Sequence, residues 1–245
     1  MSKTKLRIMQ DFVDFNNNKP DGIYLDINKE NIFKNYALIV GPNNTPYFGG
    51  YYLFEVIFPK NYPNSSPSVK LLTIDGKTRI NPNLYECGKV CLSILGTWEG
   101  PGWKKVMNLR TVLLSIQSLL HEFPIQNEPG YEKTTSDDQM SIDYNHYIIF
   151  QNYRLSILEV LISINSDKPK IKHLKNFKID ILEEFKKNYQ QLNDNLKSYQ
   201  ITIGIKELKN TIYFLQDGII LDFLELNKNF DLFCNDSKKI DLNFI

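Results

Sequence analysis

Three strand-like runs near the start of the chain, joined by short turn-rich segments, restrict its possible folds more than any other feature. They are Ile23–Ile27, Phe33–Val40 and Tyr51–Phe58, and the last of them, YYLFEVIF, is rich in aromatic and β-branched residues. The Gly- and Pro-rich turn GPNNTPYFGG joins the second run to the third. This order predicts an antiparallel meander, and Ser68–Ile74 adds a fourth strand.

Helical patterns stand on both sides of the predicted sheet. Before it, residues 2–15 carry apolar side chains at helical spacing, and the turn-forming run NNNKPDG ends them. After it, Asn108–Glu122 begins with an N-capping Asn and has a stripe of Leu, Val and Ile. A Ser-Asp cap at 136–137 opens a further helix to about residue 164. Helices packed on one antiparallel sheet define an α+β fold.

The run NSDKPK at 165–170 is the clearest internal boundary. It divides the chain into a core domain, 1–165, and a helical C-terminal extension, 166–245. Within the extension we predict helices at 173–198 and 205–216, followed by an Asn-, Lys- and Asp-rich tail that ends in DLNFI. One apolar stripe of the extension consists of Leu174, Phe177, Ile181 and Phe185. Such a stripe is more often core than binding face, so the extension is either a scaffold packed on the core or a surface that recruits substrates.

Composition excludes several classes of partner. The net charge is +1, whereas nucleic-acid-binding proteins are usually strongly basic, so we expect no nucleic-acid partner. No apolar run reaches the roughly 18 residues of a membrane span, so we expect no membrane partner. The start, MSKTKLRIMQDFVDF, lacks the apolar core of a signal peptide. The three cysteines are therefore expected to be reduced thiols in the cytoplasm, the nucleus or both.

The segment from Thr78 to Trp103 has neither helical nor strand periodicity. Long irregular segments inside compact domains are usually functional. Cys91 lies within it, where a nucleophilic thiolate would be reachable; the alternative is that Cys91 merely packs between Val90 and Leu92. The three histidines are scattered and no phosphate-binding glycine motif occurs, so we predict neither a metal site nor a nucleotide site.

The run NPNLYECGKVCLSILGTW (81–98) resembles the active-site signature of the ubiquitin-conjugating (E2) enzymes, in which a Pro-Asn turn lies eight residues before the catalytic cysteine, as Asn83 lies before Cys91. The runs GPNNTPYFGGYYLFEVIFPKNYP upstream and LRTVLLSIQSLL downstream are also similar to the family's pattern, so the resemblance covers about residues 1–160. NPNLY, KVCLSILGTW and NEPGYE are most similar to the E2/E3-hybrid enzymes and the E2 domain of the BIR-repeat apoptosis inhibitors. The family's UBC-like fold is therefore expected.

This resemblance implies a function. Cys91 would accept ubiquitin as a thioester from the ubiquitin-activating enzyme (E1) and pass it to lysines of protein substrates. ATP would be used by the activating enzyme, so no cofactor is expected here. The E3 ligase partner stays undefined, because Asn64 stands where many relatives present an aromatic residue and the second contact loop reads EGPG.

The resemblance also assigns supporting roles. Asn83 would stabilise the oxyanion or hold the active-site turn, and the alternative is that it only caps the Pro82 turn. The acid that activates the attacking lysine aligns with Asn127 without a gap and with Glu128 after one insertion; we favour Glu128 over a solvated loop carboxylate. Asp137 and Asp138 are the fallback candidates, although a helix N-terminus also explains them.

Other readings remain open. Trp98 and Trp103 border the expected catalytic groove or are packing aromatics, and Cys87 is incidental or a redox partner of Cys91. The chain as a whole is an active E2, an inactive E2-like module that binds ubiquitin without a covalent bond, or a carrier of another ubiquitin-like modifier. The retained cysteine favours the active enzyme. Substrates, chain linkage and oligomeric state have no sequence signal.

Overall fold

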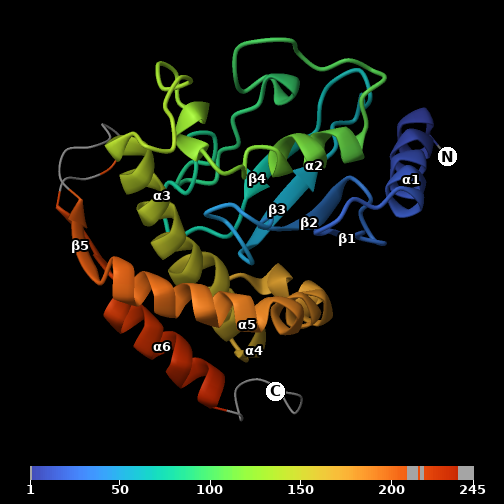
Figure 1. Cartoon of the computed structure of the whole chain (residues 1–245). Helices are drawn as coiled ribbons and strands as arrows, with labels where there is room; N and C mark the ends of the chain where they lie inside the picture. The colour runs from blue at the N-terminus through green and yellow to red at the C-terminus, as the bar shows by residue number, and fades with distance from the viewer. Residues whose placement is uncertain (1, 209–214, 216–217, 237–245) are drawn as a thin grey trace.

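A four-stranded antiparallel sheet lies at the centre of the first part of the chain in the computed structural model, which describes residues 2–208, 215 and 218–236. The strands β1, β2, β3 and β4 pair in sequence order (Figure 1). Their bounds are Ile23–Asp26, Lys34–Val40, Tyr51–Ile57 and Ser68–Leu71. The predicted meander is confirmed, and its last strand ends three residues earlier than the sequence pattern indicates.

The turn between β2 and β3 depends on two glycines. A Cβ at Gly41 would lie 1.7 Å from the carbonyl oxygen of Tyr47, and one at Gly50 would lie 1.8 Å from Oδ1 of Asn152. Asn152 in turn donates from Nδ2 to the Phe48 carbonyl at 2.9 Å. The turn is therefore tied directly to a helix about a hundred residues later in the chain, so its conformation is fixed by tertiary contacts as well as by local sequence.

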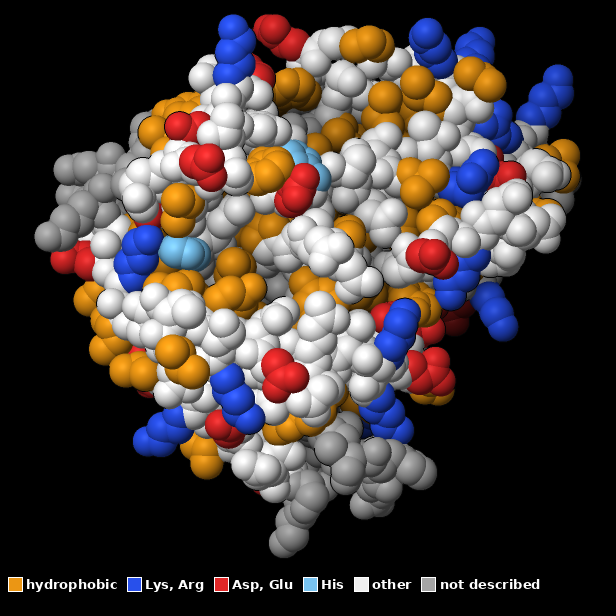
Figure 2. Space-filling model, viewed as in Figure 1, with side chains coloured by type: hydrophobic (Ala, Val, Ile, Leu, Met, Phe, Trp, Pro, Cys, Tyr) orange, Lys and Arg blue, Asp and Glu red, His pale blue; other side chains and the backbone are white. Residues whose placement is uncertain are grey.

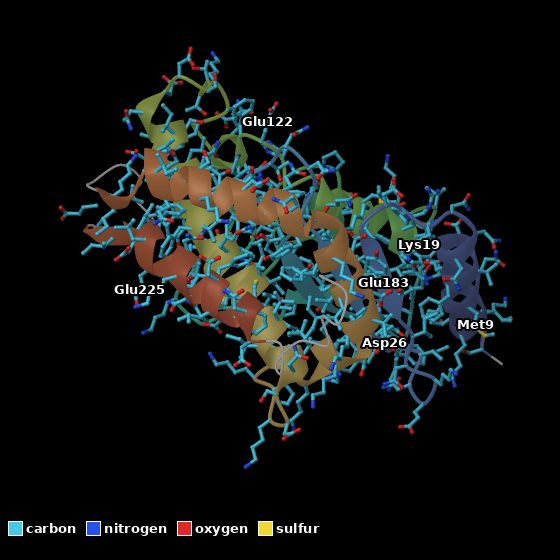
Figure 3. All side chains as sticks on the ribbon, turned by 60° about the horizontal axis from the view of Figure 1, so that its bottom comes forward. Met9, Lys19, Asp26, Glu122, Glu183 and Glu225 are labelled. Carbon is cyan, nitrogen blue, oxygen red and sulfur yellow. The ribbon has the colours of Figure 1, made fainter. Side chains whose placement is uncertain are left out.

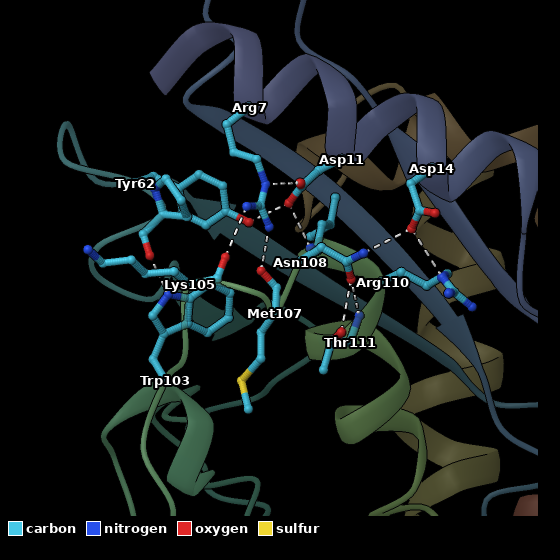
Figure 4. Close-up of polar contacts among 12 residues, drawn as sticks. Arg7, Asp11, Asp14, Tyr62, Trp103, Lys105, Met107, Asn108, Arg110 and Thr111 are labelled. Atoms are coloured by element: carbon cyan, nitrogen blue, oxygen red, sulfur yellow. Dashed lines mark hydrogen bonds and ion pairs between the residues drawn. The ribbon is translucent and has the colours of Figure 1, made fainter. Parts of the chain in front are cut away.

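The N-terminal helix α1 (Lys3–Asn17) is anchored by a buried carboxylate (Figure 4). Asp11 accepts from Nε of Arg7 at 2.8 Å, from the backbone N–H of Leu109 at 2.9 Å and from the hydroxyl of Tyr62. The Arg7 guanidinium continues to the carbonyl of Met107 at 2.7 Å. One side chain thus joins α1 to the N-terminus of α2 (Leu109–Gln117) and to the loop after β3.

Asp11→Ala should destabilise the protein by about 3 kcal/mol, because it leaves a buried hydroxyl and a buried N–H without their acceptor and removes the partner of Arg7. Asp14→Ala, one turn along the same helix, is the matched control. Its carboxylate is 29% exposed and should contribute at most about 1 kcal/mol. The midpoint of urea unfolding measures both; equal losses would contradict the anchoring role of Asp11.

The predicted helix from about 136 to 164 is confirmed in three joined parts. They are α3 (Gln139–Gln151), a π-helical segment (Asn152–Leu158) and α4 (Glu159–Asn165). By length and composition alone, the stretch Gln139–Asn165 passes as a membrane-crossing helix, but 72% of its apolar window is buried inside the fold, as in the core helix of a globular domain.

The C-terminal extension continues with a 3₁₀ segment (Lys172–Phe177), α5 (Lys178–Thr202), a hairpin of β5 (Ile205–Leu208) and β6 (Ile219–Asp222), and α6 (Phe223–Asn235). Figures 1 and 3 show α5 and α6 side by side, with Glu225 on the outer surface of α6. The apolar stripe at 174, 177, 181 and 185 is at most 2% exposed. It is therefore core, which favours the scaffold reading; the division at residue 165 stays a prediction.

The helix predicted at 205–216 is wrong in its first part. Residues 205–208 form β5, which pairs with β6 in the register Ile205 opposite Asp222. Gly204 has φ of 63° and ends α5, since a left-handed glycine breaks the helical path. The tail predicted after residue 216 is wrong over residues 219–235, which form β6 and α6. Residues 209–214, 216–217 and 237–245 lie outside the described residues.

The surface mixes both signs of charge. Figure 2 shows Lys and Arg side chains interspersed with Asp and Glu over the face viewed, in keeping with the net charge of +1. Among the described side chains, no group of three or more His, Cys, Asp or Glu is arranged to hold a metal ion.

Candidate active site

The segment that carries Cys91 is irregular, as predicted, but it is closely held. Between β4 and α2 the described regular element is a 3₁₀ turn at Ser93–Leu95, and residues 84–90 fold back beside β4. Leu71 donates its N–H to the carbonyl of Gly88 at 2.8 Å. Gly88 has φ of 87°, and a Cβ there would lie 2.4 Å from the Leu71 carbonyl oxygen. Only glycine lets this loop approach the strand so closely.

Asn83 and Cys91 bind each other twice. The N–H of Cys91 donates to the carbonyl of Asn83 at 2.9 Å, and Nδ2 of Asn83 donates to the carbonyl of Cys91 at 2.8 Å. Asn83 is 7% exposed, so these bonds lie largely out of water. The Asn83 amide therefore fixes the backbone of Cys91, as expected if Asn83 holds the active-site turn. Stabilisation of the oxyanion by Asn83 stays a prediction.

Asn81 is fully buried below this pair. Its Nδ2 donates to the hydroxyl of Tyr47 at 2.8 Å and to the carbonyl of Leu119 at 2.9 Å, and its Oδ1 accepts the N–H of Asn83 at 2.9 Å. Asn127 adds a longer bond to the same oxygen at 3.4 Å. Tyr47 was not found by sequence reasoning, because a tyrosine in a turn gives no sign of a contact more than thirty residues away.

The three thiols differ in their surroundings. Cys87 is exposed on the loop, and Cys91 is only 1% exposed. Cys234, in α6, has its pKa raised to about 12, chiefly by burial and further by the carboxylate of Asp231. Cys234 is thus a poor nucleophile at neutral pH. The expectation that Cys91 is reachable is not met in this structure, where the residue is almost fully buried.

Glu128 is not a free carboxylate. It is 5% exposed, and its Oε2 lies 3.3 Å from Nη2 of Arg79. The same Arg79 nitrogen donates to the carbonyl of Pro82 at 2.5 Å, and the guanidinium lies 4.0 Å from the centre of the Tyr85 ring. Glu128 therefore supports the Pro82–Asn83 turn through Arg79, a link that sequence reasoning missed. Its role in activating lysine stays a prediction.

The fallback acids lie at the start of α3. Asp138 is the N-cap residue, and its carboxylate accepts from the N–H of Thr135 at 2.6 Å. Asp137 accepts from the Ser136 hydroxyl at 3.1 Å. Both are exposed, which fits the helix-terminus explanation.

The two tryptophans divide between the alternatives. Trp103 donates from Nε1 to the carbonyl of Pro63 at 2.8 Å and packs against Tyr62 (Figure 4), so it is a packing aromatic. Trp98 is 40% exposed. Asn64, next to Pro63, is also exposed, so the loop after β3 presents an amide side chain.

A four-stranded meander, an irregular segment in which an asparagine holds the backbone of a cysteine, and a following helix lie together in the first part of the chain. Residues 7–148, more than half of the chain, match the family model described as ubiquitin-conjugating enzyme. This chain belongs to the ubiquitin-conjugating enzyme family. The predicted family, its fold class and its chemical class of cysteine-thioester transferases are confirmed at that level.

Individual relatives are similar over somewhat more than half of the chain. Ubiquitin-conjugating enzyme E2 Z of Xenopus tropicalis is 44% identical over 157 residues, which are 64% of this chain and 50% of that protein. A probable ubiquitin-conjugating enzyme E2 of Acanthamoeba polyphaga mimivirus, R521, is 40% identical over 57% of this chain and 10% of its own length. The human dual E2 ubiquitin-conjugating enzyme/E3 ubiquitin-protein ligase BIRC6 is 39% identical over 62% of this chain and 3% of its own length. The chain thus spans about half the length of E2 Z, and much less of the other two.

Proposed function

We propose that this chain accepts ubiquitin from an activating enzyme as a thioester on Cys91 and transfers it to lysine side chains of protein substrates. The observation that carries the proposal is the double hydrogen bond between Asn83 and Cys91, at 2.8 and 2.9 Å, in a member of the ubiquitin-conjugating enzyme family. It holds the backbone of Cys91, one of three cysteines, and the eight-residue spacing from Asn83 to Cys91 resembles the family signature.

The chemistry has two acyl transfers. The Cys91 thiolate attacks the carbonyl carbon of the activating enzyme's ubiquitin thioester; a new C–S bond forms and the activating enzyme's sulfur leaves as thiolate. A substrate lysine amine then attacks the Cys91 thioester, forming the C–N bond of an isopeptide and releasing Cys91 as thiolate. The amine loses its proton to a base or to water, because a lysine has a pKa of about 10.4.

Asn83 would serve the second transfer. Negative charge develops on the thioester carbonyl oxygen when the amine attacks, and a preorganised amide donor stabilises it. An amide carries two N–H hydrogens: one of Asn83 donates to the Cys91 carbonyl, and the second would donate to the oxyanion. Holding the turn and donating to the oxyanion are thus compatible in one side chain.

The proposed activity also implies the binding partners of the protein and the cellular compartment in which it acts. Ubiquitin, the activating enzyme and protein substrates are the expected partners, and the protein needs no cofactor of its own because the activating enzyme uses the ATP. We place the reaction in the cytoplasm, the nucleus or both. The alternative with a specific observation behind it is a noncovalent ubiquitin-binding module, because Cys91 is 1% exposed.

Mixing the protein with activating enzyme, ATP and ubiquitin separates the two functions. The carrier should give a protein–ubiquitin adduct on nonreducing gels that requires ATP and disappears with thiol reductant. A binding module should give no adduct while still shifting ubiquitin resonances on titration. Absence of an adduct with ubiquitin and with other ubiquitin-like modifiers would overturn the carrier assignment.

A further inference from the structure

A cleft of about 620 Å³ opens between the loop that precedes Cys91 and the C-terminal hairpin. Its lining includes Lys77, Arg79, Tyr85, Glu86, Tyr147 and Ile219. Tyr85 and Glu86 belong to the active-site segment, since Tyr85 follows Asn83 by two residues and its N–H donates to the Lys89 carbonyl at 3.0 Å. The cleft therefore borders the segment that holds the nucleophile, and one of its walls comes from outside the region that matches the family model.

The wall formed by the extension is fixed in place on α3. Lys206 of β5 lies 2.6 Å from Oδ1 of Asp143, which is 5% exposed, and 3.0 Å from Nδ1 of His146. On β6, Ile219 lines the cleft and shares the inward side with the fully buried Leu221. A hairpin held by a part-buried ion pair presents Ile219 to the cleft as an apolar surface.

Lysines lie on and beside the same loop: Lys77 lines the cleft, and Nζ of Lys89 lies 5.5 Å from the centre of the Tyr85 ring, which also lines it. Within the part of the chain that the structure describes, Lys70, Lys77 and Lys89 form no ion pair, and all three are exposed. Lys70 and Lys89 stand directly opposite each other across a β-bridge, where like charges repel. Glu86 is the single acid among the cleft residues named above. An acidic ligand would relieve this repulsion, and a basic ligand would increase it.

We propose that this cleft binds the segment of a protein substrate that flanks the acceptor lysine, and that it selects segments with acidic side chains near that lysine. An apolar side chain of the segment packs between Ile219 and the two tyrosines, while its carboxylates lie near Lys77 and Lys89. The extension thereby acts in substrate selection at the catalytic centre. This inference rests on the proposed ubiquitin transfer.

The test uses the full chain, charged with ubiquitin and then separated from activating enzyme and ATP. Discharge is timed onto three acceptors: free lysine, a one-lysine peptide with two Asp beside the lysine, and the same peptide with two Arg instead. Wild type should discharge onto the acidic peptide about tenfold faster than onto the basic one, because charge in a cleft concentrates the opposite charge. Lys77→Glu should abolish that preference, and Lys197→Glu, an exposed lysine on α5, should preserve it.

Ile219 and Ile220 give a matched pair for the apolar wall, since they are neighbours on β6 and Ile220 is 61% exposed. Ile219→Asp should slow discharge onto the acidic peptide about tenfold, with discharge onto free lysine unchanged. Ile220→Asp should leave both unchanged. Ile219→Ala should slow discharge onto the acidic peptide by a smaller factor. It replaces Ile219→Asp in the test if the Asp variant unfolds.

Several outcomes overturn the assignment of the cleft. The first is that wild type discharges ubiquitin onto the acidic and basic peptides at equal rates. The second is that Ile219→Asp and Ile220→Asp slow discharge equally. The third is that a variant slows discharge onto free lysine as much as onto the peptide, which would mean that it impairs the chemical step and not peptide binding. If wild type forms no thioester at all, the ubiquitin-transfer proposal fails before the cleft is tested. The two failures are therefore distinguishable.

Discussion

Cys91→Ala should abolish the thiol-labile ubiquitin adduct completely, and Cys87→Ala should leave it intact. The alanine variant has no atom that can accept the acyl group at the position fixed by Asn83. Cys87 lies four residues away on an exposed loop, and Cys234 is half-buried with its pKa raised to about 12, so neither takes over the role. Nonreducing and reducing gels after charging provide the measurement.

Two controls make this result specific. Cys91 is a buried side chain, so the thermal midpoint of Cys91→Ala must show that the variant is folded. Cys91→Ser should form an oxygen ester that resists thiol reductant and is cleaved by alkali, because the hydroxyl accepts the acyl group without a thioester. An adduct of normal yield on Cys91→Ala would contradict the assignment.

Asn83→Ala should slow transfer from Cys91 to lysine on the order of 10²–10³-fold, the usual effect of removing one oxyanion donor. The variant also loses the 2.8 Å bond that holds the Cys91 carbonyl. Charging by the activating enzyme should fall much less, because that step begins with a thiolate, which is a strong nucleophile. Single-turnover discharge of preformed thioester onto free lysine separates the two steps.

Comparison with other variants distinguishes oxyanion stabilisation from turn holding. Tyr47→Phe removes the hydroxyl that accepts from Asn81 and leaves Asn83 in place, so it should slow discharge far less than Asn83→Ala does. Asn64→Ala, at an exposed position, is the control and should have no effect. Equal losses in Tyr47→Phe and Asn83→Ala would show that turn geometry alone accounts for the rate.

The sheet and the first helices could be predicted because their signals are local. Turn residues separate runs of β-branched and aromatic residues in β1 to β3, and Asn108 caps α2 by accepting from the N–H of Thr111. The segment 205–208 has no such signal: four residues with apolar ends fit a helix or a strand equally well. These residues form a strand because they pair with β6, which completes the hairpin more than ten residues later. A pattern read from residues 205–208 alone does not include β6 and so cannot reveal the pairing.

The site was only partly predictable for a similar reason. The spacing of Asn83 and Cys91 lies within one segment and is visible in sequence. The partners of Glu128 are not: Arg79 lies 49 residues earlier, and only the fold brings the two within 3.3 Å. The burial of Cys91 was one of two alternatives, and the residues around it could not decide between packing against Val90 and Leu92 and a reachable thiolate.

The attachment site of ubiquitin tests the central claim most directly, and the sequence suits its measurement. After charging, free thiols are blocked in urea with one maleimide, the thioester is cleaved with hydroxylamine, and the released thiol is labelled with a heavier maleimide. Trypsin then separates Cys87, in peptide 80–89, from Cys91, in peptide 90–104. We predict the heavy label on peptide 90–104 alone; heavy label on peptide 80–89 or on Cys234, with none on 90–104, would contradict Cys91 as the ubiquitin carrier.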